Sequence, residues 1–159
     1  MSAAGMKLLA QIWHAGQYRR GPERTPYIEH PKAVVAKLME WGVFDDDTLA
    51  MAWGHDLLEN TKCPAKDILR VGGQEVLDGI YMLTRDDVRW PKKGGWIAHL
   101  AQNAPRPVLL VKASDRLCNA LDFIKAGRKE KAMAYLRDSF PVIAKIHPAI
   151  YEYEQLMKS

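Results

Sequence analysis

His55 and Asp56 are adjacent in the sequence, and both carry side chains that can bind a metal ion. The histidine offers an imidazole nitrogen and the aspartate offers a carboxylate oxygen. The dipeptide is frequent by chance, so it is weak evidence alone. A second histidine, His30, lies upstream before Pro31, and a second aspartate, Asp115, lies downstream. The order of these four groups predicts one metal site assembled from distant parts of the chain.

Two imidazoles and two carboxylates form a donor set of nitrogen and oxygen atoms. Such a set is harder than a thiolate zinc site and leaves coordination positions for water. Manganese, iron, zinc or cobalt in the divalent state would all suit it. A divalent ion lowers the pKa of bound water and so supplies a nucleophile near neutral pH. The predicted chemistry is therefore hydrolysis.

Two further polar residues follow the predicted ligands at helical spacing. Glu59 is four residues after His55 and three after Asp56, so these side chains can face one cleft. Because Glu59 is not needed as a ligand, we expect it to act as a general base or to orient water. Asn119 is four residues after Asp115 and is predicted to hydrogen-bond a substrate.

Each of these residues also has a structural interpretation. His30 could end a turn before a proline, Glu59 could be an exposed charge at a helix end, and Asp115 could pair with Arg116 at the surface. The joint occurrence of all the groups favours the metal site. The remaining histidines lack such support and are interpreted as structural or surface residues; they are His14, His99 and His147.

The spacing of apolar residues predicts an all-α fold, a helical bundle in one domain over 1–159. Breakers and caps divide the chain. Helices are expected over 3–15, from Pro31 to about 42, and over 47–59, 64–70, 74–83, 96–102, 106–125 and 129–157. Loops are expected over 16–29 and 84–95, with interruptions of the last helix near Pro141 and Pro148. The run 108–111 could pass for a strand, but no partner strand is evident.

The bulk properties narrow the class of protein. The 159 residues, 48% of them hydrophobic, suit one globular domain with a real core. No apolar run is long enough to span a membrane, and two cysteines make no disulfide framework, so a cytoplasmic setting is expected. A net charge of +4 is too mild to indicate nucleic-acid binding. Basic residues near the predicted metal ligands suit a phosphorylated small molecule.

Four segments together resemble a known family. They are His14–Arg20 (HAGQYRR), Thr25–Pro31 (TPYIEHP), His55–Thr61 (HDLLENT) and Lys112–Asn119 (KASDRLCN). In this order they resemble the hydrolase domain of the RelA/SpoT homologues, which are HD-superfamily enzymes that remove the 3′-pyrophosphate of (p)ppGpp with manganese. The resemblance covers residues 7–125, and the chain length is similar to that of a stand-alone small alarmone hydrolase.

The resemblance implies roles for individual residues. His30, His55, Asp56 and Asp115 match the ligands of Mn²⁺. Glu59 matches the catalytic glutamate, and Asn60 occupies the next catalytic position, where relatives usually carry an aspartate. The residues matching substrate contacts are Arg19, Arg20 and Asn119, with Lys112 added as a candidate phosphate contact.

The expected reaction is hydrolysis of ppGpp or pppGpp to GDP or GTP and pyrophosphate. Asn60 in place of an acid puts the rate and the substrate in question more than the metal. Two alternatives stay open: an HD phosphohydrolase acting on an adenine alarmone or on the 2′-phosphate of NADPH, and a non-catalytic alarmone-binding module. The sequence does not decide the oligomeric state.

Overall fold

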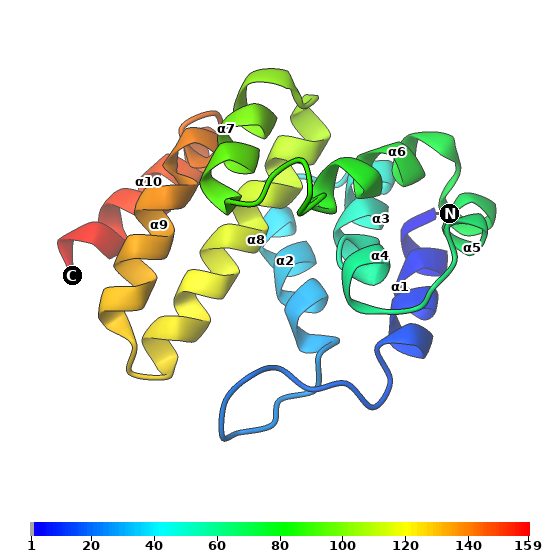
Figure 1. Ribbon diagram of the computed structural model, residues 1–159, viewed down its shortest axis with the longest axis horizontal. Coiled ribbons are helices and arrows are strands. Elements are labelled where there is room, and N and C mark those ends of the chain that lie inside the picture. The colour runs from blue at the N-terminus through cyan, green and yellow to red at the C-terminus, as the bar shows by residue number, and fades with distance from the viewer. Residues whose placement is uncertain (1) are drawn as a thin grey trace. The chain divides into compact units, whose positions relative to one another are not determined.

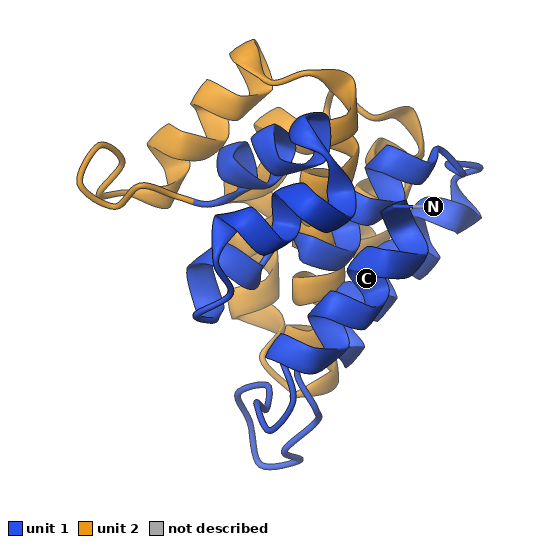
Figure 2. Cartoon of the chain, turned by 90° about the vertical axis from the view of Figure 1, so that its right-hand side faces the viewer, with its two compact units in different colours: residues 1–84 blue, residues 85–159 orange. Residues whose placement is uncertain are grey.

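The computed structural model describes residues 2–159 and contains ten helices over that range (Figure 1). They are α1 (Ser2–Trp13), α2 (Glu29–Glu40), α3 (Asp46–Gly54), α4 (Leu57–Asn60), α5 (Ala65–Gly72), α6 (Gln74–Leu83), α7 (Lys93–Asn103), α8 (Arg106–Lys125), α9 (Lys129–Ile143) and α10 (His147–Lys158). The chain divides into two compact units, residues 1–84 and 85–159 (Figure 2). The expectation of a single domain stays a prediction.

Helix α3 is the centre of the first unit, because it packs against α1, α2, α5 and α6. It is buried on nearly all sides, with Ala50, Ala52 and Trp53 in the core. The carboxylate of Asp45 caps its first turn by accepting a hydrogen bond from the backbone N–H of Thr48 at 3.0 Å. The segment that ends in the His55–Asp56 pair is therefore held firmly at its start.

Gly54, the last residue of α3, allows three helices to approach closely just before His55. A Cβ atom there would overlap the terminal methyl group of Met6 on α1 and lie 2.8 Å from Cδ1 of Ile80 on α6. Both neighbouring side chains are fully buried. The small residue is thus required by packing rather than by its backbone conformation.

Replacing Gly54 with alanine is expected to destabilise the protein by about 1–3 kcal/mol, the usual cost of overpacking a core. Alanine at Gly94 is the matched control, because a Cβ on that glycine of α7 meets no atom within 4 Å. In a helix that change is expected to be neutral or to stabilise by up to about 1 kcal/mol. Urea unfolding followed by circular dichroism measures both; equal midpoints for the two variants would contradict the packing argument.

The segment between α1 and α2 is a loop whose base is closed by backbone hydrogen bonds. The N–H of Arg19 donates to the carbonyl of Thr25 at 2.7 Å, and the N–H of Tyr27 donates to the carbonyl of Gln17 at 2.8 Å. These bonds accompany an isolated antiparallel bridge between Tyr18 and Pro26. The tip, residues 20–24, is exposed throughout. The chain therefore returns to its starting point before α2 begins.

In the second unit, α9 packs against α7, α8 and α10, and α10 also contacts α8. Helix α8 supplies much of this core; Val108, Val111 and Leu117 are fully buried. The run over 108–111 is helical, as expected. Pro141 lies inside α9 and does not interrupt it, contrary to the expectation. The break falls at 144–146, and Pro148 stands in the first turn of α10, where a missing N–H costs nothing.

The all-α prediction is confirmed over residues 2–159, where the only β feature is the isolated bridge in the loop. One expected helix is divided: the predicted 47–59 helix is α3 and α4 with a turn at His55 and Asp56. No proline or glycine follows Gly54 to signal that turn. It sets two of the predicted ligands, His55 and Asp56, at a bend rather than within a helix.

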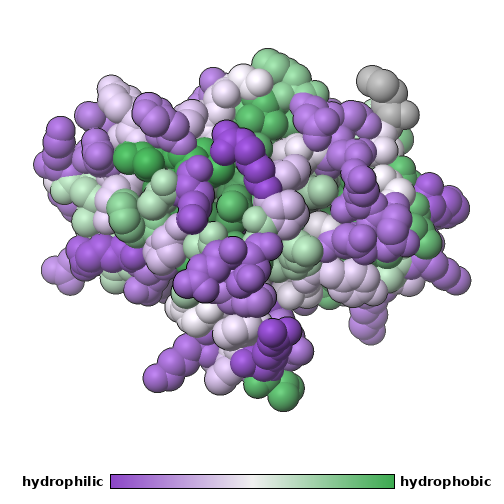
Figure 3. All heavy atoms as spheres, turned by 90° about the horizontal axis from the view of Figure 1, so that it is seen from above, coloured by the Kyte–Doolittle hydropathy of each residue, from purple (hydrophilic) through white to green (hydrophobic). Residues whose placement is uncertain are grey.

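None of the helices over residues 2–159 is both long and apolar enough to cross a membrane. The face shown in Figure 3 mixes hydrophilic side chains with smaller groups of hydrophobic ones. The largest hydrophobic side chains of the core, such as Leu38, Leu57 and Ile97, are instead fully buried.

Candidate metal centre

His30 is positioned by the first turn of α2. The helix begins at Glu29, and Pro31 fits this turn because its fixed φ angle suits a helix start. The imidazole is only 3% exposed, and its neighbours Val34 and Val35 are also buried. The side chain is thus held at the buried end of the helix, next to the loop that precedes it.

His55 and Asp56 form the turn between α3 and α4. Nδ1 of His55 lies 2.7 Å from the carbonyl oxygen of Ala52, so this nitrogen carries the hydrogen and donates it. In the neutral ring Nε2 is then the nitrogen with a lone pair. Asp56 has φ −103° and ψ 0°, in the bridge region where active-site residues are frequent. Its side chain makes no cap hydrogen bond to α4.

The structure brings His30, His55 and Asp56 together. Oδ2 of Asp56 lies 3.3 Å from Nε2 of His55 and 3.7 Å from Nε2 of His30. One ligand atom from each residue lies within 4.8 Å of the others. The Asp56 side chain is 14% exposed and the two imidazoles almost fully buried. Two imidazole nitrogens and a carboxylate oxygen at this separation could hold a divalent ion.

Asp115, predicted as the fourth ligand, lies on α8 in the second unit. Its Oδ2 is 2.9 Å from Nζ of Lys112, and its Oδ1 accepts a hydrogen bond from Nδ2 of Asn119 at 3.2 Å. Both aspartate and lysine are at least 90% buried. Its place in the metal site stays a prediction.

The residues predicted to bind substrate are distributed over both units. Lys112 pairs with Asp115 and its ammonium lies over the ring of Trp96, 4.4 Å from the centroid. Asn119 also donates to the hydroxyl of Tyr135 at 2.9 Å. In the first unit, the guanidinium of Arg19 lies 5.2 Å from the ring centroid of Tyr27. Arg20 is exposed in the loop tip.

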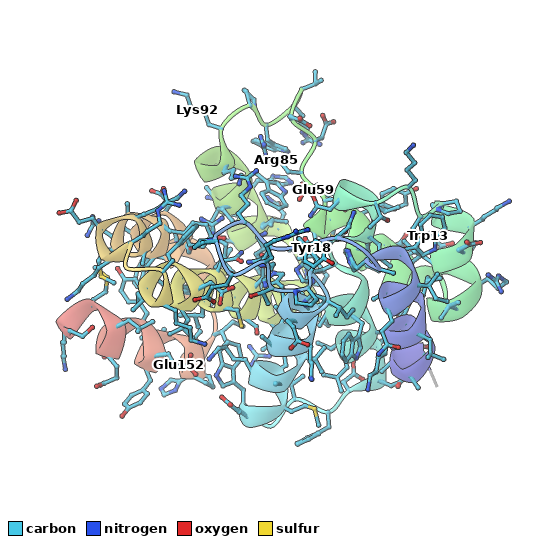
Figure 4. The ribbon with its side chains drawn as sticks, turned by 90° about the horizontal axis from the view of Figure 1, so that it is seen from below. Trp13, Tyr18, Glu59, Arg85, Lys92 and Glu152 are labelled. Carbon is cyan, nitrogen blue, oxygen red and sulfur yellow. The ribbon has the colours of Figure 1, made fainter. Side chains whose placement is uncertain are left out.

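Glu59 and Asn60 are both exposed on the short helix α4 (Figure 4 labels Glu59 and Tyr18). The loop at Tyr18 is joined to this helix by Gln17, whose Nε2 donates to the carbonyl of Asn60 at 2.8 Å. Glu59 therefore has access to solvent one turn beyond the predicted ligands, as a proton acceptor requires.

Sequence reasoning gave no role to Tyr27 and assigned His14 to the structural or surface class. The hydroxyl of Tyr27 donates to Oδ2 of Asp56 at 2.7 Å. His14 is buried, with its ring stacked on Tyr27 at 4.7 Å and its Nδ1 bonded to Oε1 of Gln17 at 2.8 Å. Burial lowers the pKa of His14, although the bond to Gln17 opposes this. The available signals were that both residues lie in segments that carry the family resemblance and that Tyr27 precedes His30 by three residues.

No protein-family model matches the chain. Among characterised proteins, the guanosine-3′,5′-bis(diphosphate) 3′-pyrophosphohydrolase MESH1 of Xenopus tropicalis is 36% identical over 113 residues, which are 69% of this chain and 62% of that protein. The bifunctional (p)ppGpp synthase/hydrolase SpoT of Escherichia coli is 32% identical over 121 residues, 70% of this chain and 16% of that protein. The chain is a homologue of the MESH1 and SpoT hydrolases.

The likeness to these hydrolases extends to the fold. A solved structure described as "A metazoan ortholog of SpoT hydrolyzes ppGpp and plays a role in starvation responses" superposes with a TM-score of 0.87. The match covers 99% of this chain and 94% of that one at 19% identity. The chain spans less than two thirds of the curated relatives it matches in sequence. The resemblance to the hydrolase domain of the RelA/SpoT homologues is confirmed, together with an HD-type helical fold.

Proposed function

We propose that the protein is a metal-dependent hydrolase that removes the 3′-pyrophosphate of guanosine alarmones. The observation that carries the proposal is the cluster of His30, His55 and Asp56. It is supported by the names of the relatives, which are 3′-pyrophosphohydrolases of guanosine-3′,5′-bis(diphosphate). The substrates are ppGpp and pppGpp, and the products are GDP or GTP and pyrophosphate.

The proposed metal ligands are His30, His55 and Asp56 from the first unit and Asp115 from the second. Mn²⁺ is the proposed ion, because the carboxylate donors suit it and the family that the sequence resembles uses it. The bond from His55 Nδ1 to the carbonyl of Ala52 supports His55 as a metal ligand, because such a second contact fixes the tautomer of a metal-binding histidine. Lys112 and Asn119 hold the two oxygens of Asp115 and would keep its carboxylate oriented.

When bound, the ion lowers the pKa of a water molecule and polarises a phosphoryl oxygen. Water attacks the phosphorus attached to the ribose 3′ oxygen while Glu59 accepts the proton of that water. The bond from the phosphorus to the 3′ oxygen breaks, and the 3′ oxygen takes up a proton to become the hydroxyl. Arg19 and Arg20 bind phosphate oxygens and offset their negative charge. Arg19 has a defined starting position above Tyr27.

Purified protein loaded with Mn²⁺ is expected to release pyrophosphate and GDP from ppGpp, measured by anion-exchange chromatography. A panel containing ppGpp, pppGpp, the adenine alarmone ppApp and NADPH ranks the substrates under one condition. The metal-stripped and heat-denatured proteins are the controls. Faster turnover of ppApp or NADPH would overturn the guanosine assignment, and tight binding of ppGpp without any turnover would show a binding module instead.

A further inference from the structure

The hydroxyl of Tyr27 lies between Asp56, a predicted metal ligand, and Asn60. It donates to Oδ2 of Asp56 at 2.7 Å and accepts a hydrogen bond from Nδ2 of Asn60 at 3.0 Å. The acceptor oxygen is the one that faces both imidazoles, 3.3 Å from His55 and 3.7 Å from His30. Tyr27 therefore contacts the proposed metal site through the ligand atom itself.

The ring of Tyr27 is held on several sides. It stacks on His14 with an interplanar angle of 23° and meets the edge of His30 at a centroid distance of 6.2 Å. Arg19 lies above the ring, and the backbone N–H of Tyr27 donates to the carbonyl of Gln17. A side chain restrained at both its ring and its backbone can deliver a hydroxyl to a fixed point, which is what orientation of a metal ligand requires.

Asn60 is also fixed in place, and by the same loop. Nε2 of Gln17 donates to the backbone carbonyl of Asn60 at 2.8 Å, while Oε1 of Gln17 accepts from Nδ1 of His14. The amide of Gln17 is thus oriented by a donor on one side and an acceptor on the other. The distance from the Asn60 side chain to Tyr27 is therefore set by the loop base, not by α4 alone.

The direction of these hydrogen bonds depends on residue 60 being an amide. A phenol has one hydrogen to donate, and an amide NH₂ can only donate to its oxygen. Asn60 therefore leaves the hydrogen of Tyr27 for Asp56. An aspartate at position 60 would be an acceptor, and two carboxylates would then compete for that single hydrogen.

We propose that Tyr27 is a positioning residue for Asp56 and that Asn60 fixes the direction of its hydrogen bond. The proposal rests on the metal site of the proposed function, but it concerns metal affinity rather than the choice of nucleotide. Contacts of this kind to a ligating carboxylate typically change metal affinity by about 10–100-fold when removed. Asn60 thus serves the geometry of the site through Tyr27 instead of accepting a proton.

Binding of Mn²⁺ alone, measured by isothermal titration calorimetry without nucleotide, tests the role of Tyr27. Tyr27→Phe is expected to raise the Kd at least about tenfold. Tyr81→Phe, which removes the hydroxyl of an exposed tyrosine on α6, is the matched control and is expected to leave the Kd unchanged. Thermal unfolding of each variant checks that it is folded. Equal Kd values for the two tyrosine variants would overturn the proposal.

The role of Asn60 is tested by a double-mutant cycle with Asn60→Asp, Tyr27→Phe and both together. The new carboxylate adds negative charge near the ion in either background, and the cycle removes this common effect. With Tyr27 present, Asn60→Asp is expected to weaken binding by at least about threefold more than it does with phenylalanine at position 27. The same fold-change in both backgrounds would show that Asn60 does not act through the hydroxyl.

The two proposals fail in different ways. Wild-type protein that binds Mn²⁺ but hydrolyses no alarmone overturns the function and leaves the Tyr27 result standing. Hydrolysis of ppGpp by a Tyr27→Phe variant with unchanged Mn²⁺ affinity overturns the positioning role and leaves the function standing. Wild-type protein that binds no Mn²⁺ overturns the positioning role.

Discussion

Asp56→Ala is expected to abolish metal binding and to lower the rate of ppGpp hydrolysis by at least about a hundredfold. Metal ions contribute several kcal/mol of transition-state stabilisation, and each 1.36 kcal/mol corresponds to a factor of ten. The effect should be large because Oδ2 of Asp56 is the point where the cluster converges. It faces both His30 and His55 and receives the hydrogen bond from Tyr27.

Pyrophosphate release and protein-bound manganese, the latter by mass spectrometry of the desalted protein, measure the two effects of Asp56→Ala. Asp78→Ala is the control, because Asp78 is exposed on α6 in the same unit and accepts a hydrogen bond at 2.7 Å from Gln74, which is also exposed. A variant at Asp56 that retained its manganese and its rate would refute the metal centre as assigned.

Glu59→Gln is expected to lower kcat by about 10²–10⁴-fold while leaving bound manganese and KM close to those of the wild type. The amide has the shape of the acid but cannot accept a proton, and general-base catalysis contributes a factor of this size. Glu59 is exposed on α4, one turn beyond Asp56, and is not a member of the buried cluster. The substitution therefore removes a proton acceptor without removing a ligand.

The corresponding control is Glu40→Gln, which makes the same chemical change at an exposed position at the end of α2. Steady-state kinetics with saturating Mn²⁺ separate kcat from KM for both variants. Loss of bound metal in Glu59→Gln would show that Glu59 belongs to the ligand set, and an unchanged kcat would show that another group accepts the proton.

The sequence predicted the helices well where apolar periodicity and breakers agree. Asp45, an aspartate just before the predicted helix over 47–59, caps α3, and the 108–111 run is helical because it continues the periodicity of α8. The turn at His55 and Asp56 was missed because no proline or glycine follows Gly54 to mark it. Pro141 was expected to interrupt a helix, but a single missing N–H near the end of α9 is tolerated.

The grouping of His30, His55 and Asp56 in one metal site could be predicted, because imidazole and carboxylate side chains are common metal ligands. The hydrogen bonds of Tyr27 could not be predicted, since they depend on how a loop closes. Residues 17 and 27 are brought together by backbone bonds at the loop base, which no periodicity encodes. The hydrogen bond that the side-chain amide of Asn60 donates to the hydroxyl of Tyr27 likewise could not be predicted from the sequence.

The loop between α1 and α2 has a hydrogen-bonded base and an exposed tip, which differ in their contacts. At the base, Tyr27 contacts the cluster through Asp56, and Gln17 bonds to His14 and Asn60. The tip at 20–24 is exposed and lies beyond the backbone bond between Arg19 and Thr25. We expect insertions or deletions in the tip to leave those contacts intact, because exposed loop tips tolerate changes in length. We therefore expect substitutions in the tip to change contacts with the proposed nucleotide substrate while metal binding stays the same.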